Sequence, residues 1–135
     1  MKAMVDLNVL MDILQKREPF FASAAALCEW GEKEGQDLAV AAHAMTTISY
    51  IVRKMAGAKA EEEALKWLMD SFEIVPADAA VFRQAMSLGL SDYEDAVVAA
   101  SAEASKCDYI VTRNIADFAK SSIPAIQPAE FLAMT

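Results

Sequence analysis

Apolar residues occur along the chain in two alternating patterns, short continuous runs and longer stretches with a helical period. A short apolar run bounded by charged residues, glycine or proline is typical of a buried strand. Five such runs are expected to be strands: residues 3–5, 37–41, 72–75, 108–112 and 124–126.

The stretches between these runs carry apolar side chains at intervals of three and four residues, which predicts helices. The first series begins at Val9 and is limited by Pro19, and the second, over residues 20–33, should end near Gly31 or Gly35. The remaining helices are expected over 44–54, 59–70, 78–88 and 93–105 and from Pro128 onward, with a brief helical turn at 115–118.

Strands thus alternate with helices almost throughout the chain, without a linker or an internal repeat. This alternation favours right-handed crossovers and a mostly parallel sheet of about five strands, covered on both faces by helices. We therefore expect an α/β three-layer sandwich, built as a single domain over residues 1–135.

Acidic residues follow the strands that should lie in this sheet. Asp6 ends the first strand, and Asn114 and Asp117 follow the fourth, while Glu94 and Asp95 open the helix that precedes it. Sites in open parallel sheets form at the carboxyl ends of the strands. The topology therefore predicts that these acids meet at one rim.

Carboxylates gathered in this way need a cation or a shared proton. Two of them about 4 Å apart repel by roughly 4 kcal/mol at an effective dielectric constant near 20. Oxygen ligands alone select hard ions such as Mg²⁺ or Mn²⁺. Structural roles remain open beside this one: Asp6 and Asp117 as caps, and Glu94 as a complement to the helix dipole. Asp12 is expected to be solvated.

Composition narrows the choice of partners. The net charge of -8 argues against sequence-blind nucleic-acid binding through a broad basic face, and fits a protein that binds cations or a basic partner. The cysteines, Cys28 and Cys107, and the single histidine, His43, lack the spacing of zinc ligands. We expect neither a signal peptide nor a membrane span, and a cytoplasmic location.

Four motifs, in order along the chain, resemble the PIN-domain family. Residues 6–12 read Asp-Leu-Asn-Val-Leu-Met-Asp, and residues 93–96 read Tyr-Glu-Asp-Ala. Residues 110–118 read Ile-Val-Thr-Arg-Asn-Ile-Ala-Asp-Phe, and residues 128–132 read Pro-Ala-Glu-Phe-Leu. Each motif alone is weak, but the ordered set is strong. The resemblance implies a Mg²⁺- or Mn²⁺-dependent ribonuclease, similar to the VapC-type toxins of bacterial toxin–antitoxin pairs.

The same resemblance implies that Asp6, Asp95 and Asp117 are the catalytic metal ligands. It places further side chains around the pocket, namely Asn8, Thr47, Glu94, Thr112 and Asn114. One position departs from the family, since Thr47 stands where a second acid, a glutamate, is usual. A threonine hydroxyl brings no charge, so the metal should bind more weakly.

Candidate contacts to RNA phosphates are Arg113, Arg53 and Lys54, with an ion pair to a nearby acid as the alternative for Arg113. The resemblance also implies an antitoxin protein and a homodimer. Two functions remain open, a metal-dependent endoribonuclease and a PIN-like binding module whose catalysis is weak because of Thr47. A phosphoacceptor domain fits poorly, because no lysine stands on a late strand and Asn8 occupies a position where an acid is wanted.

Overall fold

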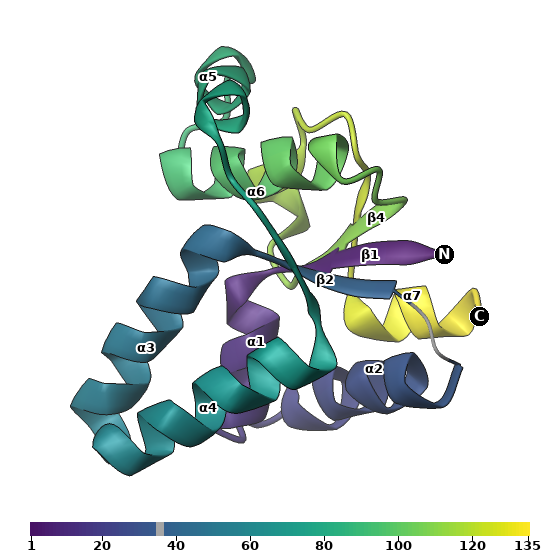
Figure 1. Cartoon of the computed structure of the whole chain (residues 1–135). Helices are drawn as coiled ribbons and strands as arrows, with labels where there is room; N and C mark the ends of the chain where they lie inside the picture. Colours follow the sequence, from purple (N-terminus) through teal and green to yellow (C-terminus); the bar gives the residue numbers. More distant parts are fainter. Residues whose placement is uncertain (35–36) are drawn as a thin grey trace.

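The computed structural model describes residues 1–34 and 37–135 and contains the five expected strands (Figure 1). Their bounds are β1 Lys2–Val5, β2 Asp37–Ala41, β3 Glu73–Val75, β4 Tyr109–Val111 and β5 Ala125–Ile126. All five pair in parallel in one sheet of order β3-β2-β1-β4-β5. The predicted sheet is confirmed, and the pairing is parallel throughout.

Seven α-helices and one 3₁₀ helix connect the strands in the described part of the chain. Their bounds are α1 Leu7–Leu14, α2 Phe21–Glu34, α3 Ala42–Ala56, α4 Ala58–Ser71, α5 Ala79–Ser87, α6 Tyr93–Ala104, η1 Ile115–Phe118 and α7 Pro128–Ala133.

The helices cover the sheet on both faces because successive strand residues point to opposite sides. Ala3 and Val5 of β1 pack in the core formed with α1, α2, α3, α4 and α7, whereas Met4 packs against α6 and Phe118. Helix α5 adds a third, smaller core on the outer side of α6, around Val81. Figure 1 shows this arrangement, with α5 and α6 on one side of the sheet and α1, α2, α3, α4 and α7 on the other. The predicted three-layer sandwich is confirmed.

Two predicted helix ends differ from the structure. Helix α1 ends at Leu14, before Pro19, and Lys16 then adopts a positive φ of 49°. Helix α2 continues through Gly31, where a Cβ would lie 2.6 Å from Cδ1 of Leu38. Gly31 therefore allows close packing of the helix on β2 and does not end the helix. The other predicted end, Gly35, lies outside the described residues.

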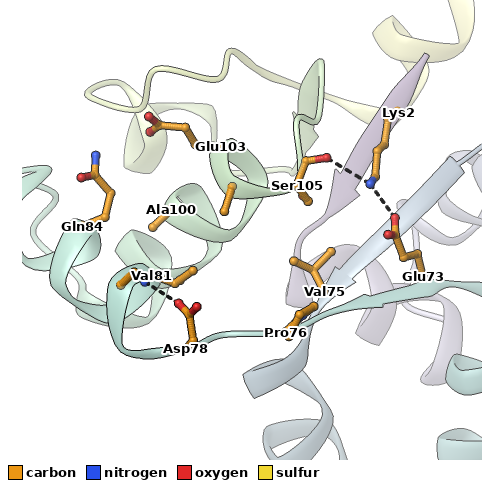
Figure 2. Close-up of a pocket in the computed structure, with 12 residues that line it drawn as sticks. Lys2, Glu73, Val75, Pro76, Asp78, Val81, Gln84, Ala100, Glu103 and Ser105 are labelled. Carbon is orange, nitrogen blue, oxygen red and sulfur yellow. Dashed lines mark hydrogen bonds and ion pairs between the residues drawn. The ribbon is translucent and has the colours of Figure 1, made fainter.

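A cavity of about 650 Å³ lies between α5, the carboxyl half of α6, β3 and Lys2 of β1 (Figure 2). Lys2 bridges this region, since its Nζ lies 2.6 Å from Glu73 and donates to the Ser105 carbonyl at 3.0 Å. The acids predicted to form the site do not line this cavity.

None of the helices in the described residues combines the length and the apolar character that a membrane span requires.

Candidate metal centre

The strand order reverses between β1 and β4, which is where open α/β sheets form their crevices. Asp6 directly follows β1 at this point and is 6% exposed. Its Oδ1 accepts a hydrogen bond from the Leu7 amide at 2.8 Å, so Asp6 also caps α1. Burial raises the pKa of Asp6, the two hydrogen bonds from Thr112 and Leu7 lower it, and the charges of Glu94 and Asp117 raise it.

The hydroxyl of Thr112, just after β4, joins the two strand ends. It is fully buried and donates to Asp6 Oδ2 at 2.8 Å, while it accepts from the Asn114 amide at 3.0 Å. Asn8 Nδ2 approaches the same oxygen at 3.5 Å, and Asn8 Oδ1 is buried without a partner. Thr112 thus fixes the carboxylate of Asp6 through neutral groups, which leaves its negative charge uncompensated.

The amino end of α6 brings three more acids to this rim. Asp92 caps the helix through a 2.9 Å hydrogen bond from the Asp95 amide, and Glu94 lies exposed in the first turn. Asp95 is half-buried, and its pKa is raised to about 7 by burial and by the charges of Asp6, Asp92, Asp117 and Glu94. Burial first, and then the surrounding negative charge, disfavour the ionised form of this carboxyl.

Asp117 completes the group from η1, where it is exposed. Its charge raises the pKa of both Asp6 and Asp95, so it lies within electrostatic reach of both. A cavity of about 210 Å³ is lined by Asp6, Leu7, Asn8, His43, Ala44, Asp92, Glu94, Asp95, Val98, Asn114 and Asp117. The structure therefore brings together the acids that the strand ends predict.

The donor set fits a divalent cation. In the described residues, no lysine or arginine forms a salt bridge with Asp6, Glu94, Asp95 or Asp117. Concentrated carboxylate charge and the orphaned Asn8 oxygen are what a hard cation would satisfy. As they stand, no three acidic, histidine or cysteine side chains of the described residues converge closely enough to hold an ion. Binding therefore requires rotation of the exposed side chains.

Thr47 lies beside this cavity on α3. Its hydroxyl donates to Glu94 Oε1 at 3.4 Å, so the side chain at this position faces the amino end of α6. A threonine there adds a neutral group next to Glu94 and no further charge.

Sequence reasoning missed His43 as a member of this site. His43 stands two residues after β2 in the first turn of α3, and it lines the cavity together with Asp6 and Glu94. The sequence does contain a sign of this role, because sites in open parallel sheets form at the carboxyl ends of the strands, and His43 follows the carboxyl end of β2 as Asp6 follows that of β1. A single histidine without a cysteine or a second histidine at zinc-ligand spacing forms no metal-binding motif of its own.

Arg113 pairs with Asp12, which is the ion-pair alternative left open from the sequence. Arg113 Nε donates to Asp12 Oδ2 at 2.7 Å and Nη2 to Oδ1 at 3.1 Å, and the guanidinium lies 4.0 Å from the centre of the Phe20 ring. The expectation that Asp12 is solvated is wrong, since it is 1% exposed. Asp12 faces inward because α1 turns this residue toward the loop after β4.

The structure places Arg53 and Lys54 away from the acids. They end α3, about 15 Å along the helix axis from His43 at 1.5 Å per residue. Arg53 Nη1 donates to Glu61 Oε1 at 3.1 Å, and Lys54 Nζ lies 5.8 Å from the centre of the Tyr50 ring. These two cations are not part of the cavity, and their contact with RNA stays a prediction.

Comparisons with known proteins agree with this geometry. A family model described as a PIN domain matches residues 2–116. No curated protein sequence matches the chain significantly.

Solved structures show the same fold at low sequence identity. A chain of VapBC2 from Rickettsia felis, bound to a DNA fragment from its promoter, matches with a TM-score of 0.71 and 16% identity over 94% of this chain and 98% of that one. A toxin–antitoxin complex from Klebsiella pneumoniae matches with a TM-score of 0.70 and 23% identity over the same shares. VapC20 of Mycobacterium tuberculosis, a toxin that cleaves the sarcin–ricin loop, matches with a TM-score of 0.66 and 14% identity over 81% of this chain and 87% of that one.

Proposed function

Because the chain belongs to the PIN-domain family, whose model matches residues 2–116, we propose that it is a metal-dependent endoribonuclease and the toxin of a toxin–antitoxin pair. The PIN and VapC proteins are nucleases, which makes hydrolysis of a phosphodiester bond the reaction class. The metal, the RNA substrate and the antitoxin are our proposals for this chain.

One observation carries the proposal: three separated segments bring uncompensated carboxylates to the point where the strand order reverses. Asp6, Asp95 and Asp117 are the residues that we propose to hold Mg²⁺ or Mn²⁺, with Glu94 beside them. A structural role alone would leave these charges paired with lysine or arginine, as Asp12 is with Arg113.

Each side chain has a distinct task in this proposal. Thr112 holds Asp6 in a fixed rotamer. Asn8 and Asn114 offer amide groups to the RNA phosphate and to the carboxylates that bind the metal. The amino end of α6 faces the cavity, so its dipole favours the approach of the phosphate. When bound, the divalent ion supplies Lewis-acid stabilisation of the phosphoryl charge and lowers the pKa of water.

Partners follow from the same proposal. A protein with a net charge of -8 does not attract RNA by itself, so the cation at the cavity must offset the repulsion of the phosphate. A basic antitoxin segment would neutralise the same acids, and we propose that it covers this rim. We also propose a homodimer.

The experiment that tests the function measures cleavage of a labelled structured RNA with and without Mg²⁺ or Mn²⁺. We expect cleavage to require the ion, and Asp6→Asn or Asp117→Asn to reduce the rate by 100-fold or more, on the order of 3 kcal/mol of transition-state stabilisation. Asp70→Asn, the same change at an exposed site on α4, should leave the rate unchanged. Equal cleavage by all four proteins would indicate a contaminating nuclease.

Thr47 supports a second candidate, a PIN-like module that binds nucleic acid or protein with weak or no catalysis. Its hydroxyl faces Glu94 without adding charge, so the site lacks one carboxylate that the family usually has. Thr47→Glu separates the candidates: a decayed site should gain metal-dependent cleavage, whereas a competent site should change by less than about threefold. Wild-type protein that binds RNA without cutting it in either ion would favour the binding module.

A further inference from the structure

His43 is the only imidazole in the sequence, and it lines the acidic cavity. It lies on a different segment from Asp6, Asp95 and Asp117, in the first turn of α3. The turn that carries it also leads to Thr47, one helical turn further along. The inference that follows rests on the proposed function only for the presence of a divalent ion.

Both ring nitrogens of His43 are buried and lack a hydrogen-bond partner of good geometry. Among the described residues, the only other side-chain atoms in this condition are Asn8 Oδ1 and Ser101 Oγ, and Asn8 lines the same cavity. A buried polar atom without a partner costs about 1–3 kcal/mol, so native proteins rarely leave one without a reason. Two orphaned residues at one cavity indicate that something absent from the chain itself satisfies them.

The surroundings of His43 favour a cation over an anion as that partner. Its charged neighbours are Glu94 and Asp6, and no basic side chain is among the groups that influence it. Burial lowers the pKa of His43 and outweighs the opposite effects of these two acids and of the nearby Glu94 backbone. The form of the ring that binds a metal ion is the neutral one, which has a free lone pair on one nitrogen.

We propose that His43 supplies a nitrogen ligand to the divalent ion, in the place of the carboxylate that Thr47 does not provide. A neutral imidazole suits ions of the later first row and contributes little to Mg²⁺, which prefers oxygen. The site therefore selects Mn²⁺ or a later divalent ion over Mg²⁺. This ligand set differs from the all-oxygen set that the sequence predicts.

The chain allows a direct test, because His43 is its only histidine. Tag-free protein is loaded with Mn²⁺ in a buffer without nitrogen ligands, and pulsed electron paramagnetic resonance is used to look for ¹⁴N hyperfine coupling. We expect coupling typical of one imidazole nitrogen in the wild type and none in His43→Gln. Coupling that persists in His43→Gln, or its absence from Mn²⁺-loaded wild type, overturns the inference.

Calorimetric titration gives the second measurement. His43→Gln should weaken Mn²⁺ binding by about tenfold or more while Mg²⁺ binding changes by less than about twofold. Adding Thr47→Glu to His43→Gln should return an oxygen ligand and bring the affinities for the two ions closer together. Equal weakening for both ions in His43→Gln contradicts a nitrogen ligand and indicates a general loss of site geometry.

The outcomes also separate this inference from the proposed function. If Mn²⁺ binds and supports cleavage without nitrogen coupling, the ligand assignment is wrong and the ribonuclease proposal stands. If neither ion binds the wild-type protein, both fail. Thermal melting of the metal-free proteins shows whether His43→Gln folds, and the wild-type resonance experiment remains decisive even if it does not.

Discussion

Asp6 and Asp12 are both buried on the same short stretch of chain, but their charges are satisfied in different ways. Asp12 binds the guanidinium of Arg113 in a two-pronged ion pair, whereas Asp6 receives only a hydroxyl and an amide. Asp12 therefore stabilises the loop after β4, whereas the negative charge of Asp6 remains free to interact with a ligand. At the scale of residues, the type of partner separates a structural carboxylate from a candidate ligand.

The Asp12–Arg113 pair predicts a large loss of stability when the cation alone is removed. Arg113→Met should lower the free energy of unfolding by about 3 kcal/mol, because it leaves a buried carboxylate with only Arg17, at 3.9 Å, to compensate it. Urea denaturation measures this value. Arg83→Met, at an exposed position on α5, is the control and should change stability by less than about 0.5 kcal/mol. A small loss for Arg113→Met would mean that the Asp12–Arg113 pair contributes little to stability.

Asp95 predicts how stability depends on pH without metal. Folding raises its pKa from 3.8 to about 7, so between these values the folded state holds more protons than the unfolded state. The melting temperature of metal-free protein should therefore fall as the pH rises from about 4 to about 7, and less so in Asp95→Asn. His43, whose pKa is lowered, gives both proteins the opposite slope below pH 6.5, so the difference between them isolates Asp95.

If the melting temperatures of wild type and Asp95→Asn changed with pH in parallel, the raised pKa of Asp95 would be contradicted. A divalent ion added to the wild type near neutral pH should raise the melting temperature, because it relieves the same repulsion. Asp95→Asn should reduce that increase.

At the scale of elements, helix α3 connects the acidic cavity to the opposite end of the helical layer. Its first turn carries His43, and its last turn meets α4 at Gly57. Ser49 donates a hydrogen bond to Glu61, and Arg53 pairs with the same carboxylate, so the first turn of α4 is held against the second half of α3. The direction of α3, and with it the placement of His43 and Thr47, depends on this hairpin.

The turn between α3 and α4 depends on the backbone conformation of Gly57. Its φ of 90° and ψ of 177° lie in a region that essentially only glycine adopts, and a Cβ there would meet nothing within 4 Å. Gly57→Ala should therefore destabilise the protein by about 1–3 kcal/mol through backbone strain alone. Thermal or urea unfolding measures the effect, with the exposed Lys59→Ala as control. An unchanged stability would mean that the two helices can meet through another turn.

The sequence predicts the elements of this fold well and the contacts between distant residues poorly. All five strands and the order of helices follow from apolar periodicity, proline and caps such as Asp78. The pairing of Asp12 with Arg113 joins positions about a hundred residues apart, which no local pattern encodes. The lack of hydrogen-bond partners at the His43 ring likewise depends on what packs around it. The acids of the cavity could be predicted because the sequence shows where the strands end.

At the scale of the whole molecule, apolar side chains remain exposed on the outer side of α5 and beside it. Phe82 of α5 and Tyr93 of α6 form a tilted ring pair. Met86, also on α5, is 75% exposed. We expect this face to form the contact between two copies, which gives the proposed homodimer a definite location.

Sedimentation equilibrium measures the mass of the protein in solution and so tests this contact. The wild type should have twice the chain mass of 14.7 kDa, and Met86→Glu should weaken the dimer by at least tenfold because it buries a charge in the contact. Met69→Glu, on the exposed side of α4, is the control and should remain dimeric. A monomeric wild type, or a dimer that Met86→Glu leaves intact, contradicts the proposed contact.

The 2.8 Å hydrogen bond between Thr112 and Asp6 has a consequence for the order of events in folding. Its two residues are separated by 106 positions, and the strands that they directly follow, β1 and β4, pair with each other in the sheet. Contacts between residues so far apart in the chain form late, since the intervening segment must first become compact. During synthesis β1 emerges early but waits for β4, so helices α1 to α4 can associate before the cavity exists. Under the proposed function, a newly made chain at this stage would lack the metal site and would not yet cleave RNA.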